Sequence, residues 1–172
     1  SRIAIISSNT AAGYGDFCNQ LTNNEFGLTF QTELFQATMQ GNRAEGDIIA
    51  CLNEINAREE EFDVVVIIRG GGATADLSSF DTLLLAENVA NFPLPIITGI
   101  GHDRDESVLD LVSFLKVKTP TAAATFLIER LSSTLSRVLE AEKSIHDYVH
   151  HRLEREYNHL NNLASRIPLL FS

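Results

Sequence analysis

The sequence has no long apolar run. None of its uninterrupted apolar stretches approaches the roughly 18–20 residues that a membrane-spanning helix requires. It also opens without a signal peptide, because Ser1 and Arg2 lead directly into the apolar run Ile3–Ile6. We therefore expect no membrane partner. A chain that begins inside a predicted strand also suggests a piece of something longer.

Cysteine is scarce as well. Two cysteines are present, Cys18 and Cys51, and they fall in different predicted helices without forming a CxxC motif. This usage is typical of the reducing cytoplasm, where thiols stay unpaired. We therefore predict a cytoplasmic location and two buried thiols.

Basic residues are outnumbered. The 172 residues include 13 Lys and Arg against 23 Asp and Glu, which gives a formal net charge of −10. Such a balance argues against a broad basic surface that binds nucleic acid by itself. It does not exclude a nucleic-acid enzyme whose basic groups lie in one cleft, or one whose DNA-binding surface lies on another domain. Solubility is the simplest consequence of the negative charge.

Apolar runs rich in β-branched residues recur along the first part of the chain, with helical patterns between them. The runs are Ile3–Ser7, about Leu28–Leu34, Val64–Ile68 and Pro95–Thr98. The second run alternates apolar and polar residues, which is typical of an edge strand, whereas the other three lack alternation and suit buried strands. The order predicts an α/β fold over residues 1–120. We expect a four-stranded, mostly parallel sheet with flanking helices, Rossmann-like or flavodoxin-like.

Three helices are predicted between and after these strands, at Asp16–Asn23, Asn42–Arg58 and Ser79–Val89. Asn42 is a candidate cap for the second helix, and Ser78 or Ser79 for the third. The second also carries isoleucines and a leucine on one face, as an amphipathic helix does.

A different pattern follows Pro120. Residues 121–166 contain no glycine or proline and form one long helical pattern, which we assign to an arm over 121–172. Its apolar residues follow a seven-residue spacing, with Glu142 at one position of the seam: Leu131, Leu135, Val138, Ile145 and Val149, continued after a phase shift by Leu153, Tyr157 and Leu160. We expect this stripe to meet partner helices; the alternative is a helix folded back on the first domain.

Polar side chains follow three of the predicted strands. Asp16 comes after the first, Arg69 after the third, and His102 with Asp105 after the fourth. In an open parallel sheet, ligands bind beyond the carboxyl ends of the strands, near the switch in strand order. We therefore expect these three loops to converge on one cleft.

Arg69 is followed by three glycines, Gly70, Gly71 and Gly72. Glycines let backbone N–H groups face an anion, and the planar guanidinium matches phosphate oxygens. The pattern favours a phosphate site, although a tight structural turn would also explain the glycines. Asp76 and Asp81 further along are better read as helix-end residues.

His102 is flanked by Gly99 and Gly101, so the backbone can bend and present the imidazole, which is able to donate or accept a proton near neutral pH. Asp105 could orient the imidazole, cap a helix, or hold a metal or water. Asp16 is a candidate general base or ligand, with a helix N-cap as its alternative. By contrast, His146 and His150 have zinc-like spacing but lack the glutamate of HExxH, so we expect no metal there.

Three ordered motifs resemble the large subunit family of exodeoxyribonuclease VII. "IRGGGATADLSSF" is similar to the family's GRGGGS-x-x-DL-x-x-F, "GIGHDRDESVLDLV" to VGHE-x-D-x-x-x-x-D, and "KTPTAAA" to TP-[ST]-AAA. The resemblance covers roughly residues 2–131 and continues into the family's long helix. Departures occur at Ile68, Ala73, Ala75, Asp103 and Arg104.

The resemblance implies an exonuclease that hydrolyses single-stranded DNA to short oligonucleotides. It carries the family's catalytic residues onto Asp16, Arg69, His102 and Asp105. It also implies an N-terminal OB-fold and a further stretch of arm outside this chain, and a small helical subunit bound in several copies along the arm. No cofactor is strictly required, although Asp16 and Asp105 could recruit Mg²⁺.

Two readings of a different class remain open. A small-phosphate-binding or response-regulator-like module would use a similar sheet and glycine loop, but it would leave His102 and Asp105 without a task. A scaffold would use the long helix and leave the cleft idle.

Overall fold

A computed structural model describes residues 1–69, 77–100 and 107–166 of the chain. The chain divides into two compact units, Ser1–Leu131 and Ser132–Ser172. The first unit is an α/β fold. None of the helices in the described ranges combines the length and hydropathy of a membrane span.

Five parallel strands form the sheet of the first unit. They are β1 (Arg2–Ser7), β2 (Gln31–Gln36), β3 (Val64–Ile68), β4 (Ile96–Gly99) and β5 (Leu115–Lys116), in the spatial order β2-β1-β3-β4-β5. This is the flavodoxin-like order, in which the direction of winding switches between β1 and β3. The parallel α/β fold is therefore confirmed. The expected strand number was wrong, because the two-residue β5 at the sheet edge has no sequence signal of its own.

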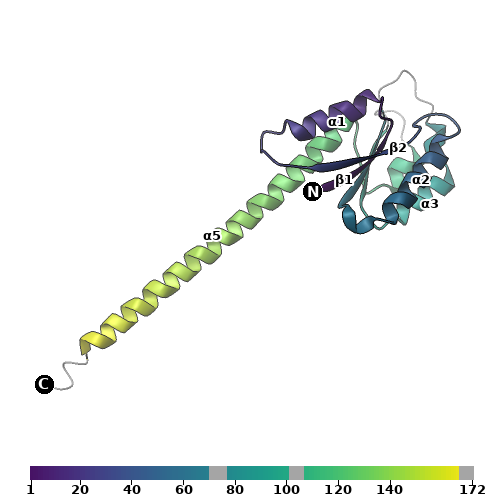
Figure 1. Cartoon of the computed structure of the whole chain (residues 1–172). Helices are drawn as coiled ribbons and strands as arrows, with labels where there is room; N and C mark the ends of the chain where they lie inside the picture. Colours follow the sequence, from purple (N-terminus) through teal and green to yellow (C-terminus); the bar gives the residue numbers. More distant parts are fainter. Residues whose placement is uncertain (70–76, 101–106, 167–172) are drawn as a thin grey trace. The chain divides into compact units, whose positions relative to one another are not determined.

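Helices cover both faces of the sheet. On one face lie α2 (Ala44–Asn56), α3 (Leu83–Ala90) and the short α4 (Val108–Val112), packed on Ile6, Val65 and Ile67. On the other face α1 (Ala12–Thr22) and the first turns of α5 (Pro120–Arg166) pack on Ile5, Val66 and Ile68 (Figure 1). The strand residues alternate between the two cores, as their period of two requires.

The helix boundaries correct several expectations. Asn42 does not cap α2, whose N-cap is Arg43 without a side-chain bond. Thr82, and not Ser78 or Ser79, caps α3 through a bond from the Leu85 N–H, because these serines belong to a short 3-10 helix, η2 (Ser78–Phe80). A helix start near Asp105 was expected, and the short α4 begins at Val108 with Ser107 as its N-cap.

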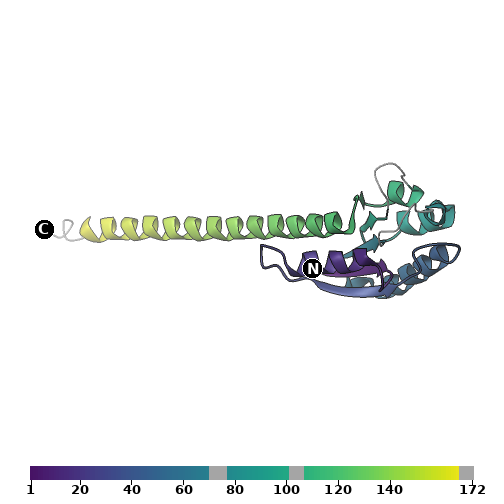
Figure 2. The same ribbon diagram turned by 90° about the horizontal axis from the view of Figure 1, so that it is seen from above.

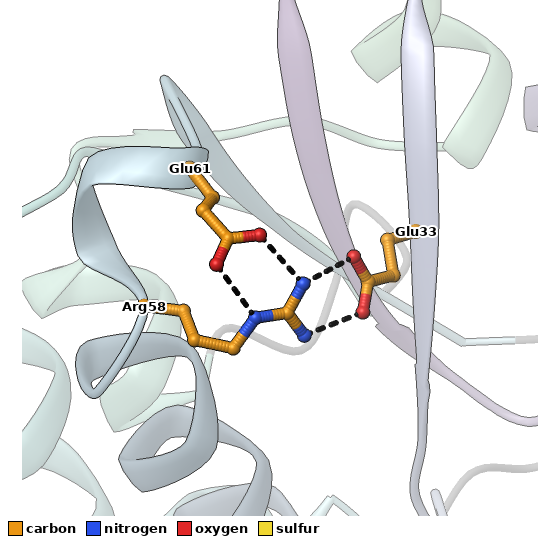
Figure 3. Close-up of polar contacts among 3 residues, drawn as sticks. All are labelled: Glu33, Arg58 and Glu61. Atoms are coloured by element: carbon orange, nitrogen blue, oxygen red, sulfur yellow. Dashed lines mark hydrogen bonds and ion pairs between the residues drawn. The ribbon is translucent and has the colours of Figure 1, made fainter.

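Edge strand β2 is fastened by a charged cluster. The Arg58 guanidinium donates to both Glu33 oxygens on β2, at 2.7 and 2.9 Å, and to both Glu61 oxygens, at 3.2 and 2.8 Å (Figure 3). It also lies over the rings of Phe35 and Phe62, with Cζ 5.9 and 5.3 Å from their centroids. These bonds raise the pKa of Arg58 above its usual range and lower the pKa of Glu61. The cluster joins β2 to η1 (Glu59–Glu61), the turn that precedes β3.

The second unit consists, in its described part, of the remainder of α5. The helix is continuous over 47 residues (Figure 2). All its side chains from Ser133 to Arg166 are exposed. They include the predicted apolar stripe, with Leu135, Val149 and Leu153 at 45%, 48% and 65% exposure.

Candidate functional site

A cleft of about 610 Å³ lies beyond the carboxyl ends of β1, β2 and β3. The described residues that line it are Ser8, Thr10, Ala11, Ala12, Gln36, Ala37, Thr38, Met39, Gln40, Asp47 and Arg69. They come from the β1–α1 connection, the β2–α2 connection, the first turn of α2 and the end of β3. The cleft thus occupies the switch point at which this topology binds ligands.

Arg69 is the buried cation of the cleft. The residue is 6% exposed, and its backbone N–H donates to the Gly99 carbonyl at 3.4 Å. Among the residues that the structure describes, none accepts a hydrogen bond from its buried Nε and Nη1 atoms. Leaving buried donors of a charged group unsatisfied costs several kcal/mol. An anionic ligand in the cleft would remove this cost.

The start of α1 adds a second positive feature beside Arg69. The helix begins at Ala12 with Ala11 as N-cap, and no side chain caps it. A Cβ built on Gly13 would come within 2.7 Å of the Arg69 carbonyl oxygen and 2.7 Å of Pro120 Cγ, so the glycine allows this close approach. The positive end of the α1 dipole therefore lies against the Arg69 backbone.

The β2 side of the cleft is a polar wall that includes Gln36, Thr38 and Gln40, and its backbone is held by a hydrogen bond to α2. Ala37 and Met39 are buried, whereas Gln36 and Gln40 are exposed and line the cleft. The backbone N–H of Thr38 donates to the Asp47 carboxylate at 3.0 Å. Bonds from Thr38 lower the pKa of Asp47 below its ordinary value, so the carboxylate is ionised at neutral pH as an ordinary aspartate is.

The β2–α2 connection turns at Gly41, whose φ of +73° lies in the left-handed region. The Gly41 carbonyl accepts a bond from the Ser79 hydroxyl at 3.0 Å. This bond ties the polar wall to η2, which follows the glycine-rich part of the sequence.

A buried polar network holds the residues on either side of 101–106. The Asp110 carboxylate, 5% exposed at residue level, accepts from the Thr98 hydroxyl at 2.7 Å and from the Ser107 hydroxyl at 3.0 Å. The Ser107 hydroxyl in turn accepts from the Asp110 N–H at 3.2 Å, which makes a capping box at the start of α4. The end of β4 and the start of α4 are therefore joined through one carboxylate.

Arg69 and Asp16 are the two predicted catalytic residues that lie within the described ranges, and the structure places them differently. Arg69 lies in the cleft as expected. Asp16 is an exposed residue inside α1, so it is not an N-cap, and it is not among the described residues that line the cleft. The other predicted residues, Gly70, Gly71, Gly72, Asp76, His102 and Asp105, lie outside the described residues. Asp81 is confirmed as a helix-end residue, because it accepts a bond from the Val108 N–H.

The sequence analysis missed the β2 side of the cleft and gave no role to Asp110, the last aspartate of the second motif. Gln36, Thr38 and Gln40 carry no charge and match no motif, so only the β1–β2 pairing reveals their position. Asp110 had a signal, because Ser107 and Asp110 have the spacing of a capping box.

The thiols also differ from expectation. Cys51 is buried, and burial raises its pKa to about 11. Cys18 is only half-buried, so the prediction of two buried thiols was wrong for it. Cys18 packs on the α1 face of the sheet and Cys51 on the α2 face.

Among the described residues, one group of three side chains could bring metal-ligand atoms within 4.8 Å of one another: His150, His151 and Glu154. All three are exposed, and the Nδ1 atoms of the histidines lie 3.7 and 3.6 Å from the Glu154 oxygens. The group differs from the His146 and His150 pair of the sequence, and its distances describe contacts between exposed side chains on α5.

Comparison with known proteins identifies one family. Residues 1–171 match the family described as "Exonuclease VII, large subunit". The chain is 34% identical over 148 residues to the "Exodeoxyribonuclease 7 large subunit" of Deinococcus radiodurans, covering 84% of this chain and 35% of the relative. The proteins of the same name from Clostridium tetani and a Nostoc species are 33% and 34% identical, covering 94% and 98% of this chain and 40% of each relative. The chain therefore spans 35–40% of the length of these curated relatives.

Proposed function

The chain belongs to the exonuclease VII large subunit family, and we propose that it carries the catalytic site of an exodeoxyribonuclease. The proposed reaction is hydrolysis of phosphodiester bonds in single-stranded DNA, with release of short oligonucleotides. The observation that carries this proposal is the buried Arg69, whose Nε and Nη1 atoms have no acceptor among the described residues.

In this proposal Arg69 binds the nonbridging oxygens of the scissile phosphate. Negative charge builds on these oxygens in the transition state, so the guanidinium and the start of α1 stabilise it more strongly than the ground state. The amides of Gly70, Gly71 and Gly72 would extend the same anion site. Because Arg69 is already desolvated and held against α1, little reorganisation is needed when the charge develops.

Proton transfer falls to His102 in this proposal, acting on the attacking water or the leaving oxygen. Asp105 would orient the imidazole or hold the water. Asp16, exposed on α1, would be the second carboxylate and would act on a strand lying over that helix. We propose that no metal is strictly required. Asp16 and Asp105 offer the oxygen ligands that would hold Mg²⁺, which would supply further charge neutralisation when bound.

The partners in this proposal are single-stranded DNA and a small helical subunit, in several copies, with no membrane. The exposed apolar stripe of α5 supports the second partner, because such a surface is ordinarily covered by another chain. A cytoplasmic location is consistent with DNA as the substrate.

A module that binds a small phosphate compound without cleaving anything would share Arg69 and the same cleft. The two functions differ in turnover. We propose an assay on end-labelled single-stranded DNA, using the chain alone, the chain with the small subunit and the full-length assembly, each with and without EDTA. Cleavage that Arg69→Ala reduces 100-fold or more, with the fold intact by circular dichroism, supports the nuclease. Full activity in Arg69→Ala, or no cleavage by the full-length assembly, contradicts it.

A further inference from the structure

We infer that the cleft between the carboxyl ends of β2 and β3 binds one nucleoside of the substrate strand, whose phosphate lies at Arg69. This inference rests on the proposed nuclease function and adds a recognition site to it. The residues that would contact the nucleoside are Gln36, Thr38 and Gln40, which no sequence motif marks.

The volume of the cleft indicates a ligand larger than phosphate. At about 610 Å³ it falls within the range of roughly 300–1,000 Å³ that is typical of sites for whole small molecules. Arg69 and the start of α1 suffice for one phosphate group, so most of this space lies beyond it. The residues that line the cleft from the β1–α1 side have small side chains: Ser8, Thr10, Ala11 and Ala12.

The span of the cleft also suits one nucleotide. β1 lies between β2 and β3, so the ends of the outer two strands are separated by two strand spacings, or about 10 Å. A nucleotide with its phosphate at the β3 end would bring its base to the β2 end.

The charges orient that ligand. Arg69 stands at the β3 end, and the ionised carboxylate of Asp47 stands on α2 beside the β2 connection. A second phosphate near Asp47 would be repelled, whereas an uncharged nucleoside would not. The phosphate therefore belongs at Arg69 and the nucleoside at the polar wall.

The polar wall explains how any base could be accepted. Gln36 and Gln40 each offer a donor and an acceptor on a flexible side chain, which can match the edges of different bases. The described residues that line the cleft include no aromatic ring, so hydrogen bonds, and not stacking, would hold the base. The backbone behind the wall is fixed by buried Met39 and by the Thr38–Asp47 bond.

The first test measures binding without cleavage. Thymidine 5′-monophosphate has no phosphodiester bond, so its binding to the chain can be followed by NMR titration beside thymidine and inorganic phosphate. We expect the nucleotide to bind more tightly than either part. The variant Gln36→Ala/Gln40→Ala should weaken nucleotide binding on the order of tenfold, since two hydrogen bonds are lost, and leave phosphate binding unchanged. Gln20→Ala/Gln31→Ala, which removes two exposed glutamines elsewhere, should change neither.

The second test uses turnover. The double variant should raise the KM for an oligonucleotide by a larger factor than it lowers kcat, because the glutamines are proposed to bind the nucleoside and not to act on the scissile phosphate. Equal nucleotide binding by the parent chain and the double variant would overturn the nucleoside site even if DNA is cleaved. A different result would overturn the nuclease function alone. In that case the nucleotide binds and the two glutamines are needed for binding, but the full-length assembly does not cleave DNA, so the nucleoside site is supported without the nuclease.

Discussion

The carboxylate of Asp81 accepts a hydrogen bond from the backbone N–H of Val108 at 2.8 Å. Asp81 ends η2, which follows residues 70–76, and Val108 begins α4, which follows residues 101–106. The segments that follow residues 70–76 and 101–106 are therefore joined directly to each other, although 27 positions separate Asp81 from Val108 in the chain.

Replacing Asp81 tests this link. Asp81→Ala removes an acceptor at a helix start and should lower the free energy of unfolding by about 1 kcal/mol, as the loss of a cap does. Asp81→Asn keeps an acceptor and should retain most of the stability. Urea denaturation of the two variants beside the parent chain measures the difference, and equal stability of all three would show that the bond contributes nothing.

Asp110 should be the costlier residue to remove. Asp110→Ala leaves the buried hydroxyl groups of Thr98 and Ser107 without their acceptor, so we expect a loss of about 2–4 kcal/mol. Asp110→Asn retains one acceptor oxygen and should lose less. Thermal unfolding of the three proteins should give the highest melting temperature for the parent chain, a lower one for Asp110→Asn and the lowest for Asp110→Ala. An Ala variant as stable as the parent would show that the network does not stabilise the fold.

Gly13 and Gly15 form a matched pair in α1. Gly13→Ala introduces a Cβ 2.7 Å from the Arg69 carbonyl oxygen, so it should destabilise the first unit by about 1–3 kcal/mol. No atom lies within 4 Å of the corresponding position on Gly15, and Gly15→Ala should stabilise the chain by about 0.5–1 kcal/mol through helix propensity. Opposite shifts in the melting temperature are the expected result. Shifts of the same sign would contradict the close contact at Gly13.

The buried thiol of Cys51 should be unreactive, and its ionisation should make the stability of the fold depend on pH. Cys51, with a pKa of about 11, stays protonated and should resist thiol reagents at pH 8 until the chain unfolds. Because its folded pKa lies above the ordinary value of 9.0, the unfolded thiol loses its proton first. The stabilisation is therefore present below about pH 9 and lost as the pH rises toward 11. Cys51→Ala should remove this part of the alkaline loss, measured by denaturation at several pH values.

Surface substitutions on α5 test its stripe. Val149→Glu places a charge on the exposed apolar stripe and should reduce binding of the proposed small helical subunit at least tenfold in a pull-down titration. Asn158→Glu, on the opposite face by helical spacing, should leave binding unchanged. Loss of binding in both variants, or in neither, would argue against the stripe as the docking surface.

The sequence predicted the strands with the strongest physical signal. β1, β3 and β4 are continuous β-branched runs, so both their existence and approximate bounds were correct. β2 was placed about three residues early, because the apolar and polar residues of "LTFQTELF" alternate most clearly at its start, over Leu28–Gln31. Its actual bounds follow from pairing with β1, which matches Arg2 to Gln31 and Ser7 to Gln36. That pairing is a tertiary contact and leaves no mark in the local pattern.

The cleft was predictable only in part. Arg69 carries a charge at a strand end, and strand order alone brings such residues to the switch point. Gln36 and Gln40 resemble ordinary surface residues until β2 is placed beside β1. Asp16 was misplaced because α1 begins four residues earlier than expected, at Ala12, without a capping side chain to announce its start.

The charged cluster of Glu33, Arg58 and Glu61 has a consequence for association between copies of the chain. β2 is an edge strand, and an exposed edge is a template on which another strand can pair. A second chain adding there would have to desolvate Glu33 and disturb both of its bonds to Arg58. The cluster therefore acts against growth of the sheet from molecule to molecule, as charged side chains on edge strands do in general.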